Sequence, residues 1–402
     1  MAPPYMYDFD TPVARRGTNC SKWDGLKKEF GREDLLPFWV ADMDFRSAPE
    51  IIAALREKVE FGVFGYPIMG DAGREAVAEW ERTRHGWSVK PDDVGYVAGV
   101  VAGLAAAVIE FTEPGDGVVV QPPVYPPFFR VIRENGRTVV ENPLRETRDG
   151  YEMDLGHLRN ALAPGVKALL LCSPHNPVAR VWRGDELAAL AEICAERGVM
   201  IICDEIHQDL VYSDAKHVPM SLAAPSVSPL LVTLVAPSKT FNIAGLTASA
   251  WIAEDAGVAV RMKRALNRLQ ISSLNLMALT ALEAAYSKGA PWLDAALAYL
   301  EKNRGFVEGF LRGEMPRVKL KHPEGTYIFW LDFRDYGLSN YELANILINE
   351  ARVALNNGAN FGSSGGGFAR LNIGCPRAQL AEGLDRIKRA FERIGRSDPR
   401  EP

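Results

Sequence analysis

The feature that most constrains the fold is a series of short apolar runs between residues 95 and 250 that alternate with helical patterns. The runs are DGVVVQ, VKALLLCSP, GVMIICDE and LLVTLVAPS, and their length and Val/Ile/Leu content are typical of buried strands. Between two of them, DELAALAEICAERG has acidic residues in its first turn and Gly198 at its end, as expected of a helix. Strands that alternate with helices predict an α/β fold with a mainly parallel sheet.

Three of these predicted strands are followed by a conspicuous polar residue. Asn176 comes after LLLCSPH, Asp204 after MIIC, and Lys239 after LVAPS. Because ligands of open α/β sheets bind at the carboxyl ends of the strands, we expect the three side chains to meet at one site.

Lys239 has the setting of a reactive amine. A lysine that directly follows a buried apolar strand is costly to bury as a cation, and desolvation lowers its pKa, so that the amine becomes nucleophilic. The alternative is an exposed lysine in a loop, and it would be favoured if the SK pair stood alone. The neighbouring polar residues favour a functional lysine.

Asp204 is suited to pair with a protonated nitrogen of a heterocyclic ring. At an effective dielectric constant of 20, such a pair at about 4 Å gains roughly 4 kcal/mol before desolvation, enough to keep the ring charged. The alternative for Asp204 is a helix N-cap. Gly99 precedes a predicted helix whose free N–H groups, at Val100 and Val101, could bind a phosphate, although simple helix packing is the favoured explanation for a single glycine.

Composition narrows the function further. The formal charge of −5 gives no basic surface for nucleic acid, and no dense Lys/Arg tract suggests binding to a membrane surface. The five cysteines have no C-x-x-C spacing and are interpreted as reduced, and the N-terminus lacks an apolar signal segment, so we expect a cytoplasmic protein. The six histidines form no metal-binding pattern, and no metal site is expected.

The length of 402 residues predicts two domains. After residue 290 the pattern becomes helix, strand, helix, strand, which is typical of a smaller α+β domain. We expect a large domain over residues 48–289 and a small domain formed by residues 1–47 and 290–402.

Taken together, these residues resemble fold-type I pyridoxal phosphate (PLP) enzymes of the class I/II aminotransferase superfamily, in the branch of cystathionine β-lyases and other C–S lyases. The similarity extends over nearly the whole chain. The matching segments are LPFWVADMDF (36–45), GYP (65–67), QPPVYPPF (121–128), CSPHNPVARVW (172–182), DEIHQDLVY (204–212), APSKTFNIAGL (236–246) and ARLNIGCPR (369–377). The resemblance implies an aspartate aminotransferase-like fold and a homodimer whose subunits share their active sites.

The resemblance also implies a role for each site residue. Lys239 would form the Schiff base with PLP, Asp204 would pair with the pyridine nitrogen, and Asn176 would bind the phenolic oxygen. Tyr125 would stack on the ring, and Lys239, Asp204 and Tyr125 would be the catalytic residues. Phosphate contacts would come from Val100, Val101 and Ser238. Arg370 would bind the substrate carboxylate, and Tyr66 of the partner subunit would reach both cofactor and substrate.

Two positions favour the lyase branch. His207 stands where many aminotransferases have a tyrosine, although a structural histidine is an alternative, and Thr247 stands where many have a phosphate-binding arginine. Ala179 replaces the usual glycine of the HNPxGR motif, and Trp39 and Asp42 are interpreted as packing residues near the substrate.

The expected function is α,β-elimination from cystathionine or a related cysteine S-conjugate, with homocysteine or another thiol, pyruvate and ammonia as products. An aminotransferase, or a PLP-binding regulator without turnover, is the alternative. The acid that protonates the thiolate is Lys239 or a tyrosine.

Overall fold

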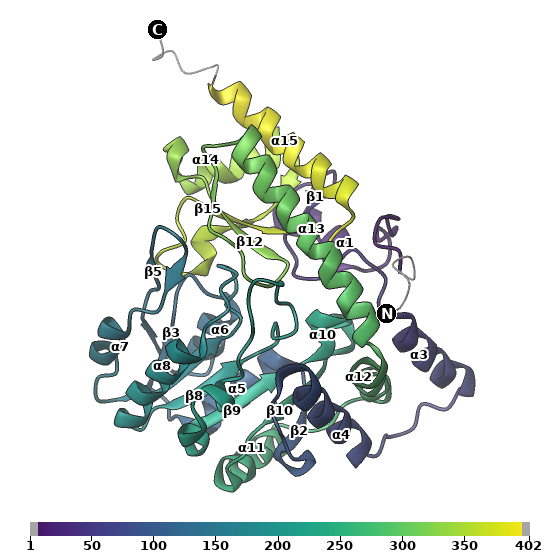
Figure 1. Ribbon diagram of the computed structural model, residues 1–402, viewed down its shortest axis with the longest axis vertical. Coiled ribbons are helices and arrows are strands. Elements are labelled where there is room, and N and C mark those ends of the chain that lie inside the picture. Colours follow the sequence, from purple (N-terminus) through teal and green to yellow (C-terminus); the bar gives the residue numbers. More distant parts are fainter. Residues whose placement is uncertain (1–6, 396–402) are drawn as a thin grey trace.

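The computed structural model describes residues 7–395, and its largest element is a seven-stranded sheet in the lower half of the molecule (Figure 1). In spatial order its strands are β2 (Val94–Ala98), β10 (Ala248–Ile252), β9 (Leu231–Val235), β8 (Met200–Asp204), β7 (Val166–Cys172), β3 (Gly117–Val120) and β4 (Thr138–Glu141). Strands β9, β8, β7, β3 and β4 are parallel, and β10 is antiparallel to both of its neighbours. The four apolar runs are β3, β7, β8 and β9, so the predicted parallel sheet is confirmed.

Successive residues of the central strands face two different helical layers. Leu170 and Ile202 pack in one core with helices α5 (Val100–Phe111) and α11 (Ala256–Arg268). Leu171 and Ile201 pack in the other core with α8 (Gly184–Arg197). Each such side chain is fully buried and contributes about 1.5–3 kcal/mol relative to exposure. The remaining helices of these layers are α6 (Pro127–Glu134), α7 (Leu155–Ala161) and α9 (Met220–Ala223).

A third group of helices covers the β2 and β10 side of the sheet. Helix α12 (Leu276–Lys288) contacts β10 and packs against both α3 (Pro49–Phe61) and α4 (Asp71–Trp80). Helix α4 continues into a π-helical turn, η1 (Glu81–His85). The shorter elements here are η2 (Pro91–Asp93), α10 (Pro237–Thr240) and η4 (Ala244–Leu246), whereas η3 (Pro225–Leu230) packs against α8, α9 and α11.

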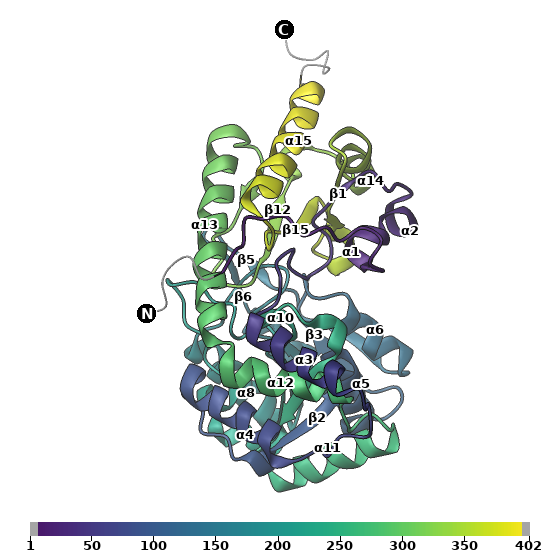
Figure 2. The same cartoon turned by 90° about the vertical axis from the view of Figure 1, so that its right-hand side faces the viewer.

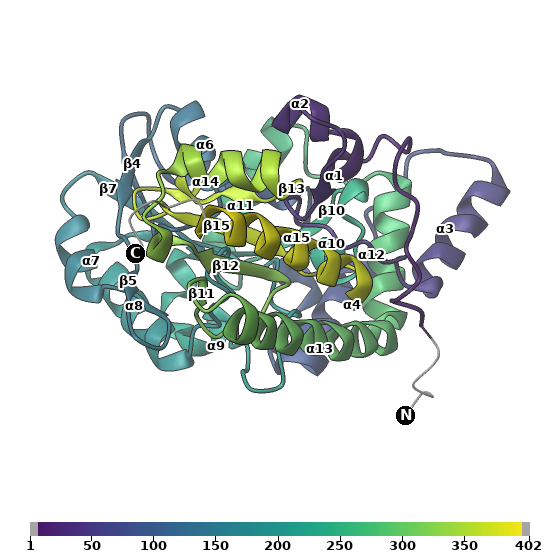
Figure 3. The ribbon, with the colours of Figure 1, turned by 90° about the horizontal axis from the view of Figure 1, so that it is seen from above.

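A second sheet lies above the first (Figure 2). Its order is β11 (Lys319–Leu320), β12 (Ile328–Asp332), β15 (Phe368–Asn372) and β14 (Asn356–Asn357), and every pair is antiparallel. Helices α13 (Ala290–Glu314) and α15 (Arg377–Gly395) run side by side over it (Figure 3). Near the N-terminus, β1 (Leu36–Pro37) pairs in parallel with β13 (Val353–Ala354), so this early segment joins the C-terminal part of the chain.

The other elements are short. They are α1 (Ser21–Asp24), α2 (Leu26–Phe30), β5 (Arg145–Glu146), β6 (Tyr151–Glu152), η5 (Arg334–Tyr336), α14 (Asn340–Asn345), η6 (Ile346–Glu350) and η7 (Gly358–Phe361). The second helix predicted after residue 290 is α14 followed by the π-helical η6. Gly198 has φ 61° after α8, which is the left-handed conformation expected there.

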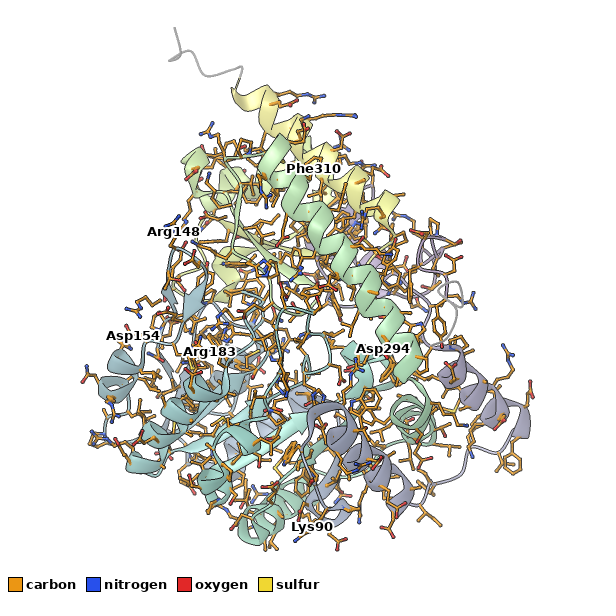
Figure 4. The ribbon with its side chains drawn as sticks, viewed as in Figure 1. Lys90, Arg148, Asp154, Arg183, Asp294 and Phe310 are labelled. Carbon is orange, nitrogen blue, oxygen red and sulfur yellow. The ribbon has the colours of Figure 1, made fainter. Side chains whose placement is uncertain are left out.

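Helix α13 extends between the levels of the two sheets. Asp294 lies toward its lower end and Phe310 toward its upper end (Figure 4). Near the lower end, Arg84 of η1 forms an ion pair with Asp294 at 2.8 Å. The division into a large domain (48–289) and a small domain (1–47 and 290–402) stays a prediction.

Candidate active site

A cavity of about 240 Å³ lies at the carboxyl edge of the large sheet. Asn176, Asp204 and Lys239 all line it, as expected from their positions after β7, β8 and β9. Adjacent strands β8 and β9 pair in parallel, with Asp204 opposite Leu234, and the ladder thereby brings their ends together. Five more of the expected residues line the same cavity: Val100, Val101, Tyr125, His207 and Ser238.

Lys239 lies in α10, a single turn that follows β9 after Ala236. Its Nζ donates a hydrogen bond of 2.7 Å to the carbonyl oxygen of Ala41. Burial, together with the nearby Arg370, lowers the pKa of Lys239 to about 8, against the attraction of Asp42 and Asp204. At pH 7 about a tenth of the side chain is therefore the neutral, nucleophilic amine, far more than for an ordinary lysine.

Asp204 is the last residue of β8 and is buried. Burial raises the pKa of its carboxyl group to about 7, although the Ile206 N–H, which donates to Oδ1 at 3.1 Å, and Lys239 both favour the ionised form. The residues directly after Asp204 form turns, so the alternative of a helix N-cap is wrong. A cationic partner beside this carboxylate would restore its charge.

Asn176 and Arg370 meet across the two sheets. Arg370, in the middle of β15, donates from Nη1 to Asn176 Oδ1 at 3.3 Å, and from Nη2 to the Trp39 carbonyl and to Asn356 Oδ1, both at 2.7 Å. Burial lowers the pKa of this guanidinium to about 10. Arg370 Nε is buried and has no hydrogen-bond partner within residues 7–395. Since three of the five guanidinium N–H groups are used, Nε–H and the second N–H of Nη1 are left for a ligand.

The end of the cavity at α5 provides donors for an anion. Gly99 has φ 102°, a conformation that favours glycine, and helix α5 starts directly after it at Val100. The first N–H groups of a helix have no partner inside the helix, so Val100 and Val101 can donate to an anion. Ser238 and Thr247 also line the cavity, and the Thr247 hydroxyl donates to the Leu246 carbonyl at 2.7 Å.

Tyr125 and His207 supply aromatic surfaces. Burial raises the pKa of the Tyr125 hydroxyl, and its ring meets Phe128 edge-on with centroids 6.2 Å apart. Burial, together with Lys239 and Arg370, lowers the pKa of His207 to about 3, so the imidazole is neutral at physiological pH. Its Nδ1 is buried without a hydrogen-bond partner in the described part of the chain. The interpretation of His207 as a satisfied structural histidine therefore does not fit this geometry.

Residues 39–45, here called the strap, contribute Ala41 to the lining of the cavity and were not expected to hold site residues. The Ala41 carbonyl accepts two hydrogen bonds. One comes from Lys239 Nζ, and the other comes from the Tyr327 hydroxyl at 3.0 Å. Asn242, three residues after Lys239, binds the N–H and carbonyl of Met43 and the carbonyl of Phe45.

A further amide holds the other side of the strap. Asn372 Nδ2 donates to the carbonyls of Val40 and Asp42, both at 2.6 Å. The sequence interpretation of Trp39 and Asp42 as packing residues missed that their backbone carbonyls are acceptors. Only the LPFWVADMDF segment pointed to this region.

Tyr66 lies outside the cavity of its own chain. It is fully exposed, on the segment between α3 and α4. Its expected role, as a residue of the partner subunit, stays a prediction.

Residues 33–387 match the family described as aminotransferase class I and II. Among curated proteins, the chain is 46% identical to cystathionine beta-lyase PatB of Bacillus subtilis, over 96% of this chain and all of that protein. It is 39% identical to protein MalY of Escherichia coli, over 97% of this chain and all of that one. Among solved structures, it is similar to cystalysin from Treponema denticola, which contains PLP, with a TM-score of 0.93, 33% identity, and 97% and 100% coverage. The expected aspartate aminotransferase-like fold is confirmed, and the chain belongs to the class I and II aminotransferase family.

Proposed function

We propose that this chain is a PLP-dependent C–S β-lyase that converts cystathionine, or a related cysteine S-conjugate, to a thiol, pyruvate and ammonia. The observation that carries this conclusion is the cavity in which Lys239, Asp204 and Asn176 converge. The choice of reaction follows the relatives, because the chain aligns with a cystathionine β-lyase over that protein's full length.

The residues around the cavity fit PLP. A buried carboxylate, Asp204, suits a pyridinium nitrogen, and the first turn of α5 with Ser238 suits a phosphate. His207 Nδ1 is a buried polar atom without a partner in residues 7–395, as expected where a ligand would supply one. When bound, PLP supplies a ring that accepts electrons from the substrate's Cα.

Lys239 has two functions in this proposal. Its neutral amine would hold the cofactor covalently, and as a free amine its Nζ would accept the proton from the substrate's Cα. A pKa near 8 suits both steps, because a general base works best when its pKa is close to the operating pH. The Ala41 carbonyl, 2.7 Å from Nζ, gives the free amine a fixed acceptor.

Arg370 binds the α-carboxylate of the substrate. It already donates to three acceptors, which fix the plane of the guanidinium, and its Nε remains unpartnered in the described residues. Asn176 would hold the phenolic oxygen of the cofactor, and its Oδ1 accepts a hydrogen bond from the same guanidinium. The cofactor ring and the substrate carboxylate are thereby held by one connected set of side chains.

The active enzyme is a homodimer in this proposal, and Tyr66 of one subunit reaches the site of the other. The support is a group of exposed apolar side chains around α3 and the loop after it: Val59, Phe61, Val63, Phe64, Tyr66 and Ile68. Such a contiguous run is unusual on a monomer and indicates an interface.

We also propose a cytoplasmic location, which free thiols at all five cysteines support. None of the helices in residues 7–395 combines the length and apolar character needed to cross a membrane.

The test is to incubate the purified protein with cystathionine and to measure pyruvate with no keto acid added. Lys239→Ala is the matched control, since it removes only the reactive amine. Pyruvate from the wild type but not from the variant supports the proposal. A requirement for a keto acid would identify an aminotransferase, and bound PLP without turnover of either kind would indicate a regulator.

A further inference from the structure

A buried carboxylate behind the cavity connects the two segments that carry Lys239 and Asp204. Asp209 lies five residues after Asp204, and its Oδ2 accepts a hydrogen bond of 2.7 Å from the hydroxyl of Thr240. Thr240 is fully buried and follows Lys239 directly. Neither Asp209 nor Thr240 lines the cavity.

The other oxygen of Asp209 is fixed from a different part of the chain. Oδ1 accepts from the Trp80 indole N–H at 2.9 Å and lies 2.8 Å from Nε2 of His85. Trp80 ends α4, and His85 ends the π-helical turn η1. The bonds from His85, Thr240 and Trp80 outweigh the effect of burial and lower the pKa of Asp209, so it is an ionised acceptor of three donors.

Lys239 needs support of this kind because its own helix is only one turn long. Helix α10 spans four residues, and a single turn gains little from its internal hydrogen bonds. Its orientation must be set by external contacts. The Thr240 bond to Asp209 fixes one side of the turn, and the Asn242 bonds to the strap fix the other.

We infer that Asp209, acting through Thr240, is a positioning residue that sets the place of the Lys239 amine relative to Asp204. This inference rests on the proposed function of Lys239. Asp209 acts through geometry: the charged groups that influence the Lys239 amine are Asp42, Arg370 and Asp204, whereas Asp209 contacts the neighbouring residue. Loss of the Thr240 hydroxyl should therefore misplace the amine without changing the composition of the cavity.

The experiment compares Thr240→Val with Thr240→Ser in the full-length protein freed of PLP with hydroxylamine. Valine keeps the shape of threonine but cannot donate to Asp209, whereas serine keeps the hydroxyl. We expect Thr240→Val to capture added PLP about tenfold more slowly, measured from the absorbance band of the lysine-bound cofactor. Once PLP has been restored, Thr240→Val should have a kcat about tenfold lower than the wild type and a KM within twofold of it. The reason is that small displacements of a reacting group are costly. Thr240→Ser should stay within twofold of the wild type in both.

Ser221→Ala is the matched control for stability. Its hydroxyl is also buried and donates to a carboxylate, Glu254, at 2.8 Å. Like Thr240 it does not line the cavity, but it lies in α9 and does not adjoin Lys239. A merely structural role for Thr240 predicts that Thr240→Val and Ser221→Ala both lower the melting temperature and leave the capture rate of folded protein unchanged; this result would overturn the inference. If Thr240→Val does not fold, Asp209→Asn takes its place, with an expected two- to tenfold loss in capture rate, and a loss below twofold overturns the inference.

Lys239→Ala in the same capture assay separates this inference from the proposed function. An absorbance band that still forms in Lys239→Ala would refute the lysine assignment itself. A band that is lost in Lys239→Ala but forms at the wild-type rate in Thr240→Val would refute the positioning role alone.

Discussion

The two walls of the cavity are held in place by different means. The wall with Asn176, Asp204 and Lys239 is formed at the ends of neighbouring parallel strands, whose backbone ladders set its geometry. The second wall consists of the strap, whose Ala41 lines the cavity, and of Arg370, which contacts Asn176 but does not itself line the cavity. This wall is held by side chains that bind backbone carbonyls of the strap, such as the bond from Arg370 to Trp39.

This difference predicts different responses to mutation. A backbone ladder persists when a side chain is replaced, so a change on the first wall should remove a chemical group and leave its neighbours in place. On the second wall, one side chain often supports another, and a single substitution should disturb both binding and position.

The largest effect is expected from Lys239→Ala on the first wall. The variant loses both the covalent attachment of PLP and the base for the Cα proton, and general acid–base catalysis alone is worth roughly 10²–10⁴-fold. We expect kcat for pyruvate formation to fall by at least about 1000-fold with little change in folding, measured by steady-state assay and circular dichroism. A visible absorbance band that persists in this variant after amines are removed would contradict the assignment.

Arg370→Lys tests the second wall. Lysine has no planar fork, so it cannot bind a carboxylate and also reach Asn176, the Trp39 carbonyl and Asn356 as arginine does. Loss of such a buried charged contact costs about 3 kcal/mol, or roughly 150-fold in kcat/KM, and the loss should fall mainly on KM.

The control for Arg370→Lys is the absorbance band of the bound cofactor, which should form at the wild-type rate because Lys239 belongs to the other wall. If the band is lost while KM is unchanged, Arg370 supports the cofactor site rather than substrate binding, and the two walls do not act independently.

The sequence predicted the first wall better than the second, for a physical reason. A strand pattern is local, and parallel strands end at a common edge, so the pattern alone placed Asn176, Asp204 and Lys239 together. Contacts of the strap are not local: Lys239 and Ala41 are 198 residues apart in the chain, and Arg370 and Trp39 are 331 apart. No local periodicity encodes such contacts, and they depend on how the second sheet packs on the first.

Arg370 and Tyr66 were therefore expected only from the family resemblance. The sequence pattern also did not predict the turns after Asp204, since a helix N-cap was an open alternative there. Asp209 gave no sequence signal, because its partners Trp80, His85 and Thr240 come from separate segments.

The pH dependence of PLP capture tests whether burial on the first wall lowers the pKa of Lys239. Capture of PLP requires the neutral amine, and the pKa of Lys239 is lowered to about 8 in the folded protein. The neutral fraction therefore rises from about 10% at pH 7 to about 90% at pH 9, roughly a ninefold change. An ordinary lysine with a pKa near 10.5 would give a rise of about 100-fold over the same interval. The capture rate of the PLP-free protein, measured across this range, distinguishes the two cases.

The control for this pH profile is the rate of PLP capture by a lysine-containing peptide under identical conditions, which removes the contribution of PLP's own ionisation. A profile of the protein that follows the peptide would mean that Lys239 is solvated, and that burial does not activate it.

The smallest effect is expected at Ala179, where the two walls are joined. Ala179 has φ 58° and is buried; its N–H donates to the His175 carbonyl at 2.9 Å, and its own carbonyl accepts from the N–H groups of Glu324 and Gly325. An alanine in the left-handed conformation costs about 1–2 kcal/mol, and glycine avoids this cost but gains freedom in the unfolded chain. Ala179→Gly should therefore stabilise the protein by about 0.5–1 kcal/mol, seen as a small rise in the urea midpoint.

Activity provides the second readout for Ala179→Gly, because these hydrogen bonds connect the loop after β7 with the segment that leads into β12. If the junction only holds the walls together, kcat and KM should stay within twofold of the wild type while stability increases. A stabilised variant with a clearly lower kcat would show that the strained alanine also sets the relative position of the walls. A loss of stability would mean that the backbone freedom of glycine in the unfolded chain outweighs the strain relieved in the folded one.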